Sequence, residues 1–278
     1  LAAASGAGLF GSSPKPRGPR RVLITGAASG FGLELAKRFI ARGDSVIATD
    51  LHDAANEDVV KLGDACTYRK LDVTSDADWE AAAEAIGAVD VLVLNAGIAV
   101  GGAIENVTLD TWHRALDINL LGAVRGCRAF VPLLEPGAQI VMTSSVAGLI
   151  HPIKMSTYNA TKAAVVALAE TVDFELRERG ITTTVICPQF FQSNLASSLT
   201  GDDADADELA RKLLTKTPLT AATVADRAMK SIDARRQVVT PDGVALVGWY
   251  AKRFARPLYL ATMRQAGKGA KRLAKRGK

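Results

Sequence analysis

The stretch RVLITGAASGFG, residues 21–32, joins a short apolar run to a glycine-rich turn. The run predicts a buried strand, and the apolar spacing of residues 30–42 predicts a helix directly after the turn. Glycine stands at positions 26, 30 and 32. Such glycines permit a tight turn, close approach of the backbone to an anion, and close packing of the helix on the strand. Because a helix N-terminus presents unpaired N–H groups, we predict a turn that binds the pyrophosphate of a dinucleotide.

Short apolar runs continue to alternate with helical segments along the chain. Five more runs follow: SVIATD, CTYRKLDV, VDVLVLN, AQIVMTSS and TTTVICP. Residues 54–62 and 76–86 have helical spacing between them, and two long helices are expected further on. Apolar strands joined by helical crossovers are typical of a parallel sheet covered on both faces. We expect one α/β domain over residues 21–243, a doubly wound (Rossmann) and mostly parallel sheet of seven strands with helices on both faces.

The two ends of the chain differ from this domain. Residues 1–20 lack a signal-peptide pattern and are expected to form a flexible leader. Ten of the 34 Lys and Arg residues lie within residues 249–278, which contain no Asp or Glu, so the remainder carries 24 basic and 29 acidic residues. The basic character therefore belongs to the tail, residues 244–278, and we do not expect the protein to bind nucleic acid.

Two interpretations of the tail remain open. It mixes VALVGWY and further aromatic residues with positive charges, which is typical of amphipathic helices that rest on an anionic membrane surface. Pro257 would bend such a helix. Alternatively, the tail folds over the substrate pocket or a neighbouring subunit and ends in solvated basic disorder.

Composition excludes several other classes of protein. Apolar residues make up 48% of the 278, which is ample for a buried core. Three widely separated cysteines without CxxC spacing argue against a disulfide framework and a structural zinc site, and no HExxH motif indicates a catalytic metal. No apolar run is long enough to span a bilayer. We expect a cytoplasmic protein. The tail leaves open the alternative that the protein also makes peripheral contact with the inner face of the membrane.

An acidic residue ends the second predicted strand. Asp50 lies about 18 residues beyond Gly32, where a carboxylate can accept hydrogen bonds from the adenosine ribose of a dinucleotide. Its charge would repel a 2′-phosphate, and no Arg or Lys follows at positions 51 or 52. The expected cofactor is therefore NAD in preference to NADP. The alternative is an ordinary strand-end Asp that caps the next helix.

A tyrosine and a lysine stand four residues apart in STYNATKAAV, residues 156–165. Positions four apart lie on the same face of a helix, so Tyr158 and Lys162 point the same way. Taken alone, the pair also fits an amphipathic surface helix on which the two are neighbours by accident.

Four motifs, which follow one another along the chain, favour a functional Tyr158–Lys162 pair over an accidental one. TGAASGFG (25–32), LNAG (94–97), TSSVAG (143–148) and YNATK (158–162) resemble those of the short-chain dehydrogenase/reductase family, over about residues 21–195. The TGxxxGxG spacing resembles its common single-domain oxidoreductase branch. The resemblance implies four catalytic residues: Asn119, Ser145, Tyr158 and Lys162. Ser145 is chosen over Ser144 because it precedes Tyr158 by thirteen residues.

The same resemblance implies a set of cofactor-binding residues. Asp72 and Val73 match the pair that contacts adenine, residues 95–97 match the segment that closes over the adenosine side and braces the sheet, and Asn119 matches the helix asparagine whose backbone holds a water beside the lysine. The full set is Thr25, Gly26, Ser29, Gly30, Phe31, Gly32, Asp50, Leu51, Asp72, Val73, Asn95, Ala96, Gly97, Tyr158, Lys162, Pro188 and Ser193. Each has a structural alternative: the serines as turn formers, Asn119 as a packing amide, Asp72 as a helix cap.

Two positions depart from the family pattern. Leu94 replaces the first Asn of NNAG, which changes little. Gln189 replaces the glycine that usually follows Pro188, so the roof of the pocket differs. Ser193 stands where a threonine normally reaches the nicotinamide carboxamide, and its hydroxyl can make the same hydrogen bond.

The resemblance implies hydride transfer between a nicotinamide cofactor and an alcohol or ketone, and Tyr158 would give or take the proton of the substrate oxygen. An unperturbed phenol, with a pKa of about 10, removes a proton poorly at neutral pH. An ammonium about 4 Å away contributes about 4 kcal/mol at an effective dielectric of 20, or roughly three pKa units. We therefore expect Lys162 to lower the pKa of Tyr158, with Ser145 donating to the substrate oxygen and Lys162 also bonding the nicotinamide ribose.

The segments expected around the substrate are residues 98–102, 146–152 and 190–199, which are mainly apolar. An apolar secondary alcohol or ketone is the expected substrate, and His151 could orient a polar group on it. The rival functions are a 3-oxoacyl carrier-protein reductase and a non-catalytic NAD-sensing regulator. A homodimer or homotetramer is expected through the two long helices that carry Asn119 and Tyr158.

Overall fold

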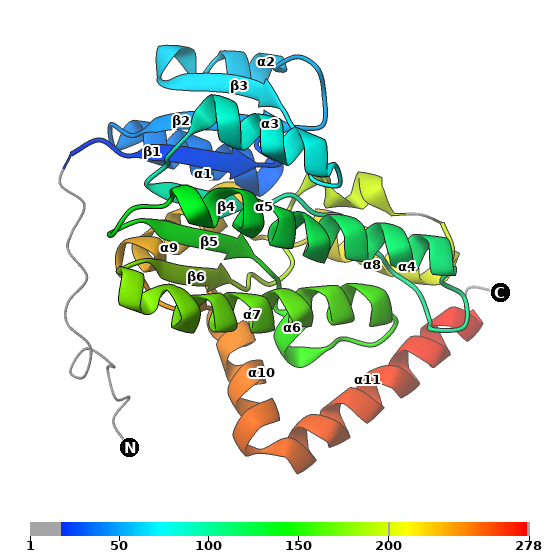
Figure 1. Ribbon diagram of the computed structural model, residues 1–278. Coiled ribbons are helices and arrows are strands. Elements are labelled where there is room, and N and C mark those ends of the chain that lie inside the picture. The colour runs from blue at the N-terminus through cyan, green and yellow to red at the C-terminus, as the bar shows by residue number, and fades with distance from the viewer. Residues whose placement is uncertain (1–17, 200, 277–278) are drawn as a thin grey trace.

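Seven parallel strands form one sheet in the order β3-β2-β1-β4-β5-β6-β7 (Figure 1). The computed structural model describes residues 18–199 and 201–276. The strands are β1 (Arg21–Thr25), β2 (Ser45–Asp50), β3 (Cys66–Lys70), β4 (Val91–Leu94), β5 (Gln139–Thr143), β6 (Thr182–Ile186) and β7 (Val238–Val239). The chain leaves β1 toward β2 and β3 and returns to its other side at β4. The strand order therefore reverses between β1 and β4, and a ligand cleft is expected beyond their carboxyl ends.

Helices cover both faces of the sheet, as predicted. Figure 1 shows α3, α5 and α7 in front of the sheet and α1 and α9 behind it. The helices are α1 (Gly30–Ala41), α2 (Glu57–Val60), α3 (Asp76–Ile86), α4 (Leu109–Leu116), α5 (Gly122–Phe130), α6 (Ala147–Ile150), α7 (Ser156–Leu176), α8 (Ala204–Thr215), α9 (Ala221–Asp233), α10 (Gly243–Phe254) and α11 (Arg256–Arg276).

Two apolar cores explain why the strands are continuously apolar. Successive strand side chains point to opposite faces. Leu23 accordingly packs in the core that contains Trp79 of α3 and Phe130 of α5. Its neighbour Ile24 packs in the other core, which contains Phe39 of α1. Most residues of β2, β1, β4, β5 and β6 are buried by one helical layer or the other, whereas the edge strand β3 is partly exposed.

Local signals determine several helix ends. The Ser75 side chain accepts a hydrogen bond from the N–H of Asp78 at the start of α3, and α3 ends at Gly87, which has φ +69°. The acidic stretch 201–208 supplies another side-chain cap. Asp203 caps α8 in this way, by accepting from the N–H of Ala206.

The helix that carries Asn119 is not continuous. Residues Asp117–Leu121 form a π-helical segment between α4 and α5. A π segment has i→i+5 hydrogen bonds, so it inserts a bulge into the helical ladder. No sequence signal indicated this bulge, and it falls at a predicted site residue.

The ends of the chain refine the predicted boundaries. The predicted leader falls mostly on residues 1–17, which lie outside the described residues. Arg20, assigned to that leader, belongs to the fold, because it is buried and its guanidinium lies 2.7 Å from the Asp44 carboxylate. In the tail, α10 ends at Phe254 and α11 begins at Arg256, so the direction of the chain changes beside Pro257. Within the described part of the chain, no helix has the length and apolarity to cross a membrane.

Candidate active site

A cleft of ≈ 860 Å³ opens along the carboxyl ends of the central strands. It is lined by most of the predicted site residues: Gly26, Ser29, Gly30, Phe31, Asp50, Leu51, Asp72, Val73, Asn95, Ala96, Gly97, Ser145, Tyr158, Lys162, Pro188 and Ser193. Thr25, Gly32 and Asn119 lie behind its walls and act on it through other residues. A cleft at the switch point of a doubly wound sheet is the usual ligand site of this fold.

The glycine turn has no room for side chains. Gly26 has φ +65°, and a Cβ there would lie 2.9 Å from Ala96 Cα. A Cβ on Gly32 would overlap the carbonyl oxygen of Gly26. These glycines therefore let α1 approach β4 closely and leave the N-terminus of α1 facing the cleft.

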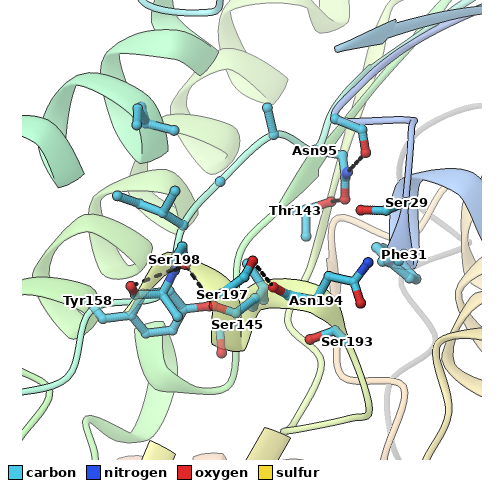
Figure 2. A pocket seen from close by; sticks show the side chains of 18 of the residues that line it. Ser29, Phe31, Asn95, Thr143, Ser145, Tyr158, Ser193, Asn194, Ser197 and Ser198 are labelled. Carbon is cyan, nitrogen blue, oxygen red and sulfur yellow. Dashed lines mark hydrogen bonds between the residues drawn. The ribbon is translucent and has the colours of Figure 1, made fainter. Parts of the chain in front are cut away.

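A network of hydrogen bonds holds the three central strands together behind this turn. The Thr25 hydroxyl accepts from the N–H groups of Asn95 and Ala96, at 3.0 and 3.1 Å. The Asn95 amide donates to Thr25 O at 3.0 Å, and its oxygen accepts from the Thr143 hydroxyl at 3.1 Å. Figure 2 shows Asn95 beside Thr143 at the edge of the cleft. One asparagine thus joins β1, β4 and β5, the bracing that was expected of it.

The Asp50 carboxylate is held in place at the end of β2. Its two oxygens accept from the N–H groups of Ala28, at 3.0 Å, and of Leu51, at 2.8 Å. The next helix, α2, is capped instead by Asn56, whose side chain accepts from the N–H of Val59. The alternative that Asp50 serves as the cap of that helix is therefore wrong. Its carboxylate lines the cleft, where it can accept further hydrogen bonds.

Asp72 and Val73 lie beyond β3 at the same end of the cleft. The Asp72 carboxylate accepts from the N–H and hydroxyl of Thr74, at 2.9 and 2.7 Å, so its side chain maintains a turn. The cap of α3 is Ser75, as described above. Trp79 Nε1 donates to Val73 O at 3.1 Å and fixes that backbone against α3. The pair therefore forms a rigid wall of the cleft.

The serine, tyrosine and lysine come together at the other end. Ser145 follows β5, and the first two turns of α7 carry Tyr158 and Lys162. Figure 2 shows the Tyr158 side chain pointing toward Ser145. The Lys162 ammonium lies 5.8 Å from the centre of the Tyr158 ring and donates to Thr143 O at 3.0 Å. Ser144, which was not chosen, donates instead to Lys162 O at 2.7 Å.

The expected acidification of Tyr158 is not present in this arrangement. Burial raises the pKa of Tyr158 to about 12, and a hydrogen bond to Ser145 acts in the opposite direction. Burial also lowers the pKa of Lys162 to about 8, against a smaller raising effect of Cys187. Both groups lose water, and burial penalises the phenolate as well as the ammonium. The estimate from Coulomb's law alone was wrong because it left out this desolvation.

Asn119 supports the lysine end from behind. Its side chain accepts from the N–H of Ile98 at 2.8 Å and donates to Ile98 O at 3.1 Å, so it holds the segment after β4. It also donates to the Thr161 hydroxyl at 3.3 Å, on α7. Gly97 is confined between Asn119 and Lys162, since a Cβ there would lie 3.0 and 3.2 Å from their polar atoms. The side chain of Asn119 therefore has a structural role of its own.

Ser193 carries an orphaned hydroxyl. Its Oγ is buried and has no hydrogen-bond partner among the described residues. Figure 2 shows Ser193 near Phe31, in the part of the cleft between the glycine turn and Tyr158. A buried hydroxyl without a partner is costly unless a ligand satisfies it. Gln189, whose effect on the roof was in doubt, also lines the cleft, and its N–H donates to Asp242 at 3.3 Å.

Several lining residues were not predicted from the sequence. Helix α8 contributes Ala210 and Leu214, and Met155 extends the apolar region that Phe190, within the predicted segment 190–199, forms near Tyr158. Arg114 lines the cleft from α4. Their positions depend on how α4 and α8 pack, and no motif marks them.

His151 does not line the cleft. It ends α6 with φ +47°, and its ring nitrogens lie 3.0 and 3.2 Å from the Lys252 ammonium. Burial and Lys252 lower its pKa, while a hydrogen bond with Gly148 acts in the opposite direction. The expectation that it orients a substrate group is corrected, because it contacts the tail instead.

Comparisons with known proteins agree with this geometry. The family model described as short chain dehydrogenase matches residues 20–204. The chain therefore belongs to the short-chain dehydrogenase family, and the fold predicted from the sequence is confirmed. Members of this family are oxidoreductases that act on CH–OH groups, and the chain is one of them.

Three known proteins show how far the similarity extends. The 2-(R)-hydroxypropyl-CoM dehydrogenase of Xanthobacter autotrophicus is 33% identical over 224 residues, which are 76% of this chain and 90% of that protein. The 3-alpha-(or 20-beta)-hydroxysteroid dehydrogenase of Mycobacterium tuberculosis is 39% identical over 173 residues, 60% of this chain and 66% of that protein. The crystal structure of a short-chain dehydrogenase from Burkholderia phymatum in complex with NAD has a TM-score of 0.80 and 29% identity, over 87% of this chain and 95% of that one.

The cleft also fits a nicotinamide dinucleotide. The glycine turn leaves space at the N-terminus of α1, Asp50 presents a fixed acceptor, and Ser193 presents a hydroxyl without a partner. Relatives of this chain use NAD in some cases and NADP in others. In the part of the chain that the structure describes, no group of His, Cys, Asp or Glu side chains could hold a metal ion.

Proposed function

We propose that this protein interconverts an apolar secondary alcohol and its ketone with NAD as cofactor, and that Tyr158 is the general acid and base. One observation carries the proposal: Ser145, Tyr158 and Lys162 line the same end of a cleft whose other end is formed by the glycine turn and Asp50. The nicotinamide, when bound, would donate or accept the hydride. The roles of the protein residues follow from their positions.

Tyr158 would exchange a proton with the substrate oxygen. Burial raises its pKa to about 12 and so keeps the phenol protonated, which suits donation to a ketone. To take a proton from an alcohol, the phenol needs added positive charge nearby. Lys162 can supply it when protonated, and so can the charge of the oxidised cofactor. Ser145 would donate to the substrate oxygen as negative charge develops there.

Lys162 and Asn119 would complete the set. The Lys162 ammonium can donate to a ribose hydroxyl while it keeps its bond to Thr143 O. The backbone of Asn119 would hold a water beside this lysine, because the π-helical segment interrupts the regular ladder of bonds at that position. Such a water would connect Lys162 with solvent.

The preference for NAD rests on Asp50. Its oxygens are already held by two backbone N–H groups, so the carboxylate cannot turn away from a ribose placed beside it. A 2′-phosphate at that position would meet a fixed negative charge. Leu51 follows, and the side chain of Lys70 is paired with Asp53 at 2.6 Å.

The substrate end of the cleft supports an apolar ligand. Met155, Phe190, Ala210 and Leu214 line it, and Ser197 and Ser198 supply hydroxyls. Both serine hydroxyls also donate to nearby backbone carbonyls, at 2.7 Å each. A ligand with one or two polar groups on an apolar body fits this lining better than a phosphorylated one.

The proposal is tested by measuring oxidation of NADH and of NADPH with a series of ketones and aldehydes. We expect turnover with NADH on apolar ketones. A 3-oxoacyl carrier-protein reductase would prefer the acyl carrier substrate and NADPH, and a regulator would bind NADH without turnover. Tyr158→Phe should abolish turnover and leave the Kd for NADH nearly unchanged. Turnover by this variant at the wild-type rate would contradict the role of the phenol.

We also propose that the protein forms a homodimer or homotetramer in the cytoplasm. Apolar side chains that lie outside the body support an association surface on the long helices: Leu121 is 43% exposed beside α5, and Phe174 is 68% exposed on α7. Sedimentation of the purified protein measures the number of subunits.

A further inference from the structure

Helix α10 has two apolar faces. One packs on the body: Ala245 is buried, Trp249 packs against the core, and a Cβ on Gly248 would lie 3.3 Å from Ile150 of α6. The other faces outward and carries large side chains spaced three to four residues apart. These are Val247, 70% exposed, Tyr250, 51%, and Phe254, 74%, continued by Leu258, 65%, at the start of α11.

Side chains of this face pack against one another. The Tyr250 and Phe254 rings stack with their centres 5.8 Å apart. Isolated exposed apolar residues are common on proteins, but Val247, Tyr250 and Phe254 share one face of α10, and a contiguous apolar strip of this kind marks a site of interaction. The strip therefore needs an occupant.

The charge around the strip identifies the occupant. Arg253 and Arg256 are exposed next to it, and Arg264 is exposed further along α11. Beyond Asp242 the sequence contains no acidic residue as far as Lys278. A second copy of the chain would bring a like charge of the same size against the tail. An anionic lipid surface complements this charge, and its interfacial region accommodates tyrosine and phenylalanine.

We infer that α10 and α11 form a surface that docks on anionic phospholipid bilayers. The strip of Val247, Tyr250, Phe254 and Leu258 would enter the interfacial layer, and the Arg and Lys residues of the tail would contact the headgroups. Figure 1 shows α10 descending from the body and α11 rising again from its lower end, so the junction of the two helices lies away from the sheet, where a flat surface can approach it.

The body orients this surface through α6. Lys252 donates to Leu149 O at 2.6 Å, and the Tyr259 hydroxyl donates to Ile150 O at 2.7 Å. These bonds hold α10 and the first turn of α11 on the opposite side from the strip. The strip is therefore presented by a fixed helix, and binding requires no folding step.

The test is co-sedimentation of the full chain with two kinds of vesicle, phosphatidylcholine alone and phosphatidylcholine with phosphatidylglycerol. We expect binding at least about tenfold stronger to the anionic vesicles, and a loss of that preference at high salt. The variant Val247→Ser/Tyr250→Ser/Phe254→Ser should lose about tenfold or more in binding. The variant Arg253→Gln/Arg256→Gln/Arg264→Gln should lose a comparable factor.

Matched variants elsewhere on the surface control for general effects. Val60, 66% exposed, and Leu109, 74% exposed, are changed to Ser, and the exposed Lys61, Arg211 and Lys230 are changed to Gln. These controls should bind as the wild type does. None of the changed residues lines the cleft, so turnover of a soluble ketone should be the same in all variants. The test of vesicle binding and the test of turnover are therefore independent. Either proposal can be contradicted while the other holds.

Three results would overturn the inference. Equal binding to both kinds of vesicle, or to neither, would remove the lipid surface as occupant. A serine variant that keeps vesicle binding would reduce the tail to a simple basic patch. A serine variant that instead changes the number of subunits in sedimentation would show that the strip is covered by a second copy of the chain.

Discussion

At the scale of single residues, the site combines groups that are costly to bury. Lys162 is almost completely buried, and its ammonium donates to Thr143 O. Tyr158 is buried beside it, and Ser193 holds a hydroxyl that has no partner in the part of the chain that the structure describes. Buried polar groups of this kind cost stability unless a partner satisfies them. That cost is the physical reason to expect a ligand that satisfies them, and it makes the site sensitive to pH.

The first residue prediction concerns pH and stability. The folded protein holds Lys162 at a pKa of about 8, below the ordinary lysine value of 10.5, so between these values the unfolded chain binds more protons. The free energy of unfolding should then rise with pH above about 8, by up to about 1.4 kcal/mol per pH unit from this group. Below pH 8 the buried ammonium imposes its full cost. Lys162→Met should remove this slope.

The measurement is urea unfolding of wild type and Lys162→Met at several pH values between neutrality and pH 9. Burial raises the pKa of Cys127, Cys187 and Tyr158 to about 12. These groups reduce the free energy of unfolding only as the pH rises above their ordinary pKa values, where the unfolded chain loses their protons first. The window is chosen to limit this opposing effect. A stability difference that does not change with pH would show that Lys162 stays charged in the fold.

The second residue prediction concerns the choice of cofactor. Asp50→Ser should weaken NADH binding about tenfold or more, because hydrogen bonds to a charged acceptor contribute roughly 1.5–3 kcal/mol. Binding of NADPH should weaken less or improve, since a repelling charge is removed. The matched control is Asp53→Ser, three residues on, whose carboxylate is exposed and pairs with Lys70. Fluorescence titration gives both constants, and equal losses in the two variants would contradict the assignment.

At the scale of elements, the closeness of helix to sheet decides the shape of the cleft. Helix α5 lies so near the sheet that a Cβ on Gly126 would overlap Leu94 of β4 and lie 2.8 Å from Trp79 of α3. At Gly122, one turn earlier, a Cβ would lie 3.1 Å from Val73. The π-helical segment and Asn119 come directly before these glycines. The position of α5 is therefore linked to the wall of the cleft.

Gly126→Ala tests this close packing. Alanine favours helices over glycine by about 1 kcal/mol, but overpacking a buried site costs roughly 1–3 kcal/mol, so we expect a net loss of stability. The control is Gly243→Ala at the start of α10, where a Cβ would meet nothing within 4 Å and the backbone is not strained. That variant should be neutral or slightly more stable. Thermal unfolding of both decides, and a stabilised Gly126→Ala would show that α5 can move.

The elements also show how much of the structure could be predicted from the sequence. Helix α3 matches its predicted range, residues 76–86, because a serine cap and a glycine stop lie in the chain itself. The glycine turn, Asp50 and the Tyr158 pair were found through fixed spacing. The π-helical segment was not, because it depends on how α4 and α5 pack. The pKa values of Tyr158 and Lys162 were also missed, because burial is a property of the assembled fold.

At the scale of the whole molecule, the tail is attached to the part of the chain that borders the cleft. Asp242, just before α10, accepts from the N–H of Gln189 and pairs with Arg227 at 2.7 Å. Lys252 and Tyr259 then bond to the last residues of α6, which follows Ser145. The structure thus corrects the alternative of a disordered tail for the described residues up to 276, which are helical. We therefore expect release of the tail to affect the lining of the cleft near Gln189.

Tyr259→Phe combined with Lys252→Met should loosen the tail. A hydrogen bond contributes about 0.5–1.5 kcal/mol, so trypsin cleavage after Arg253 should become up to about tenfold faster. The control is Tyr68→Phe, which loses a bond of the same length, 2.7 Å, to His52 O at a distant site. Limited proteolysis followed by mass determination measures both rates. Identical rates in the two variants would mean that α6 does not hold the tail.

The bonds between the tail and α6 also bear on the order of events during synthesis. The carbonyls of Leu149 and Ile150 end a short helix and have no partner within it. On the ribosome, every strand of the sheet emerges before the lysine and tyrosine that bond these carbonyls. A nascent chain can therefore assemble its sheet while the segment beside Ser145 is still incomplete. The last helices to leave the ribosome would complete the contacts of α6, so premature termination after β7 would yield a formed sheet whose α6 lacks these two bonds.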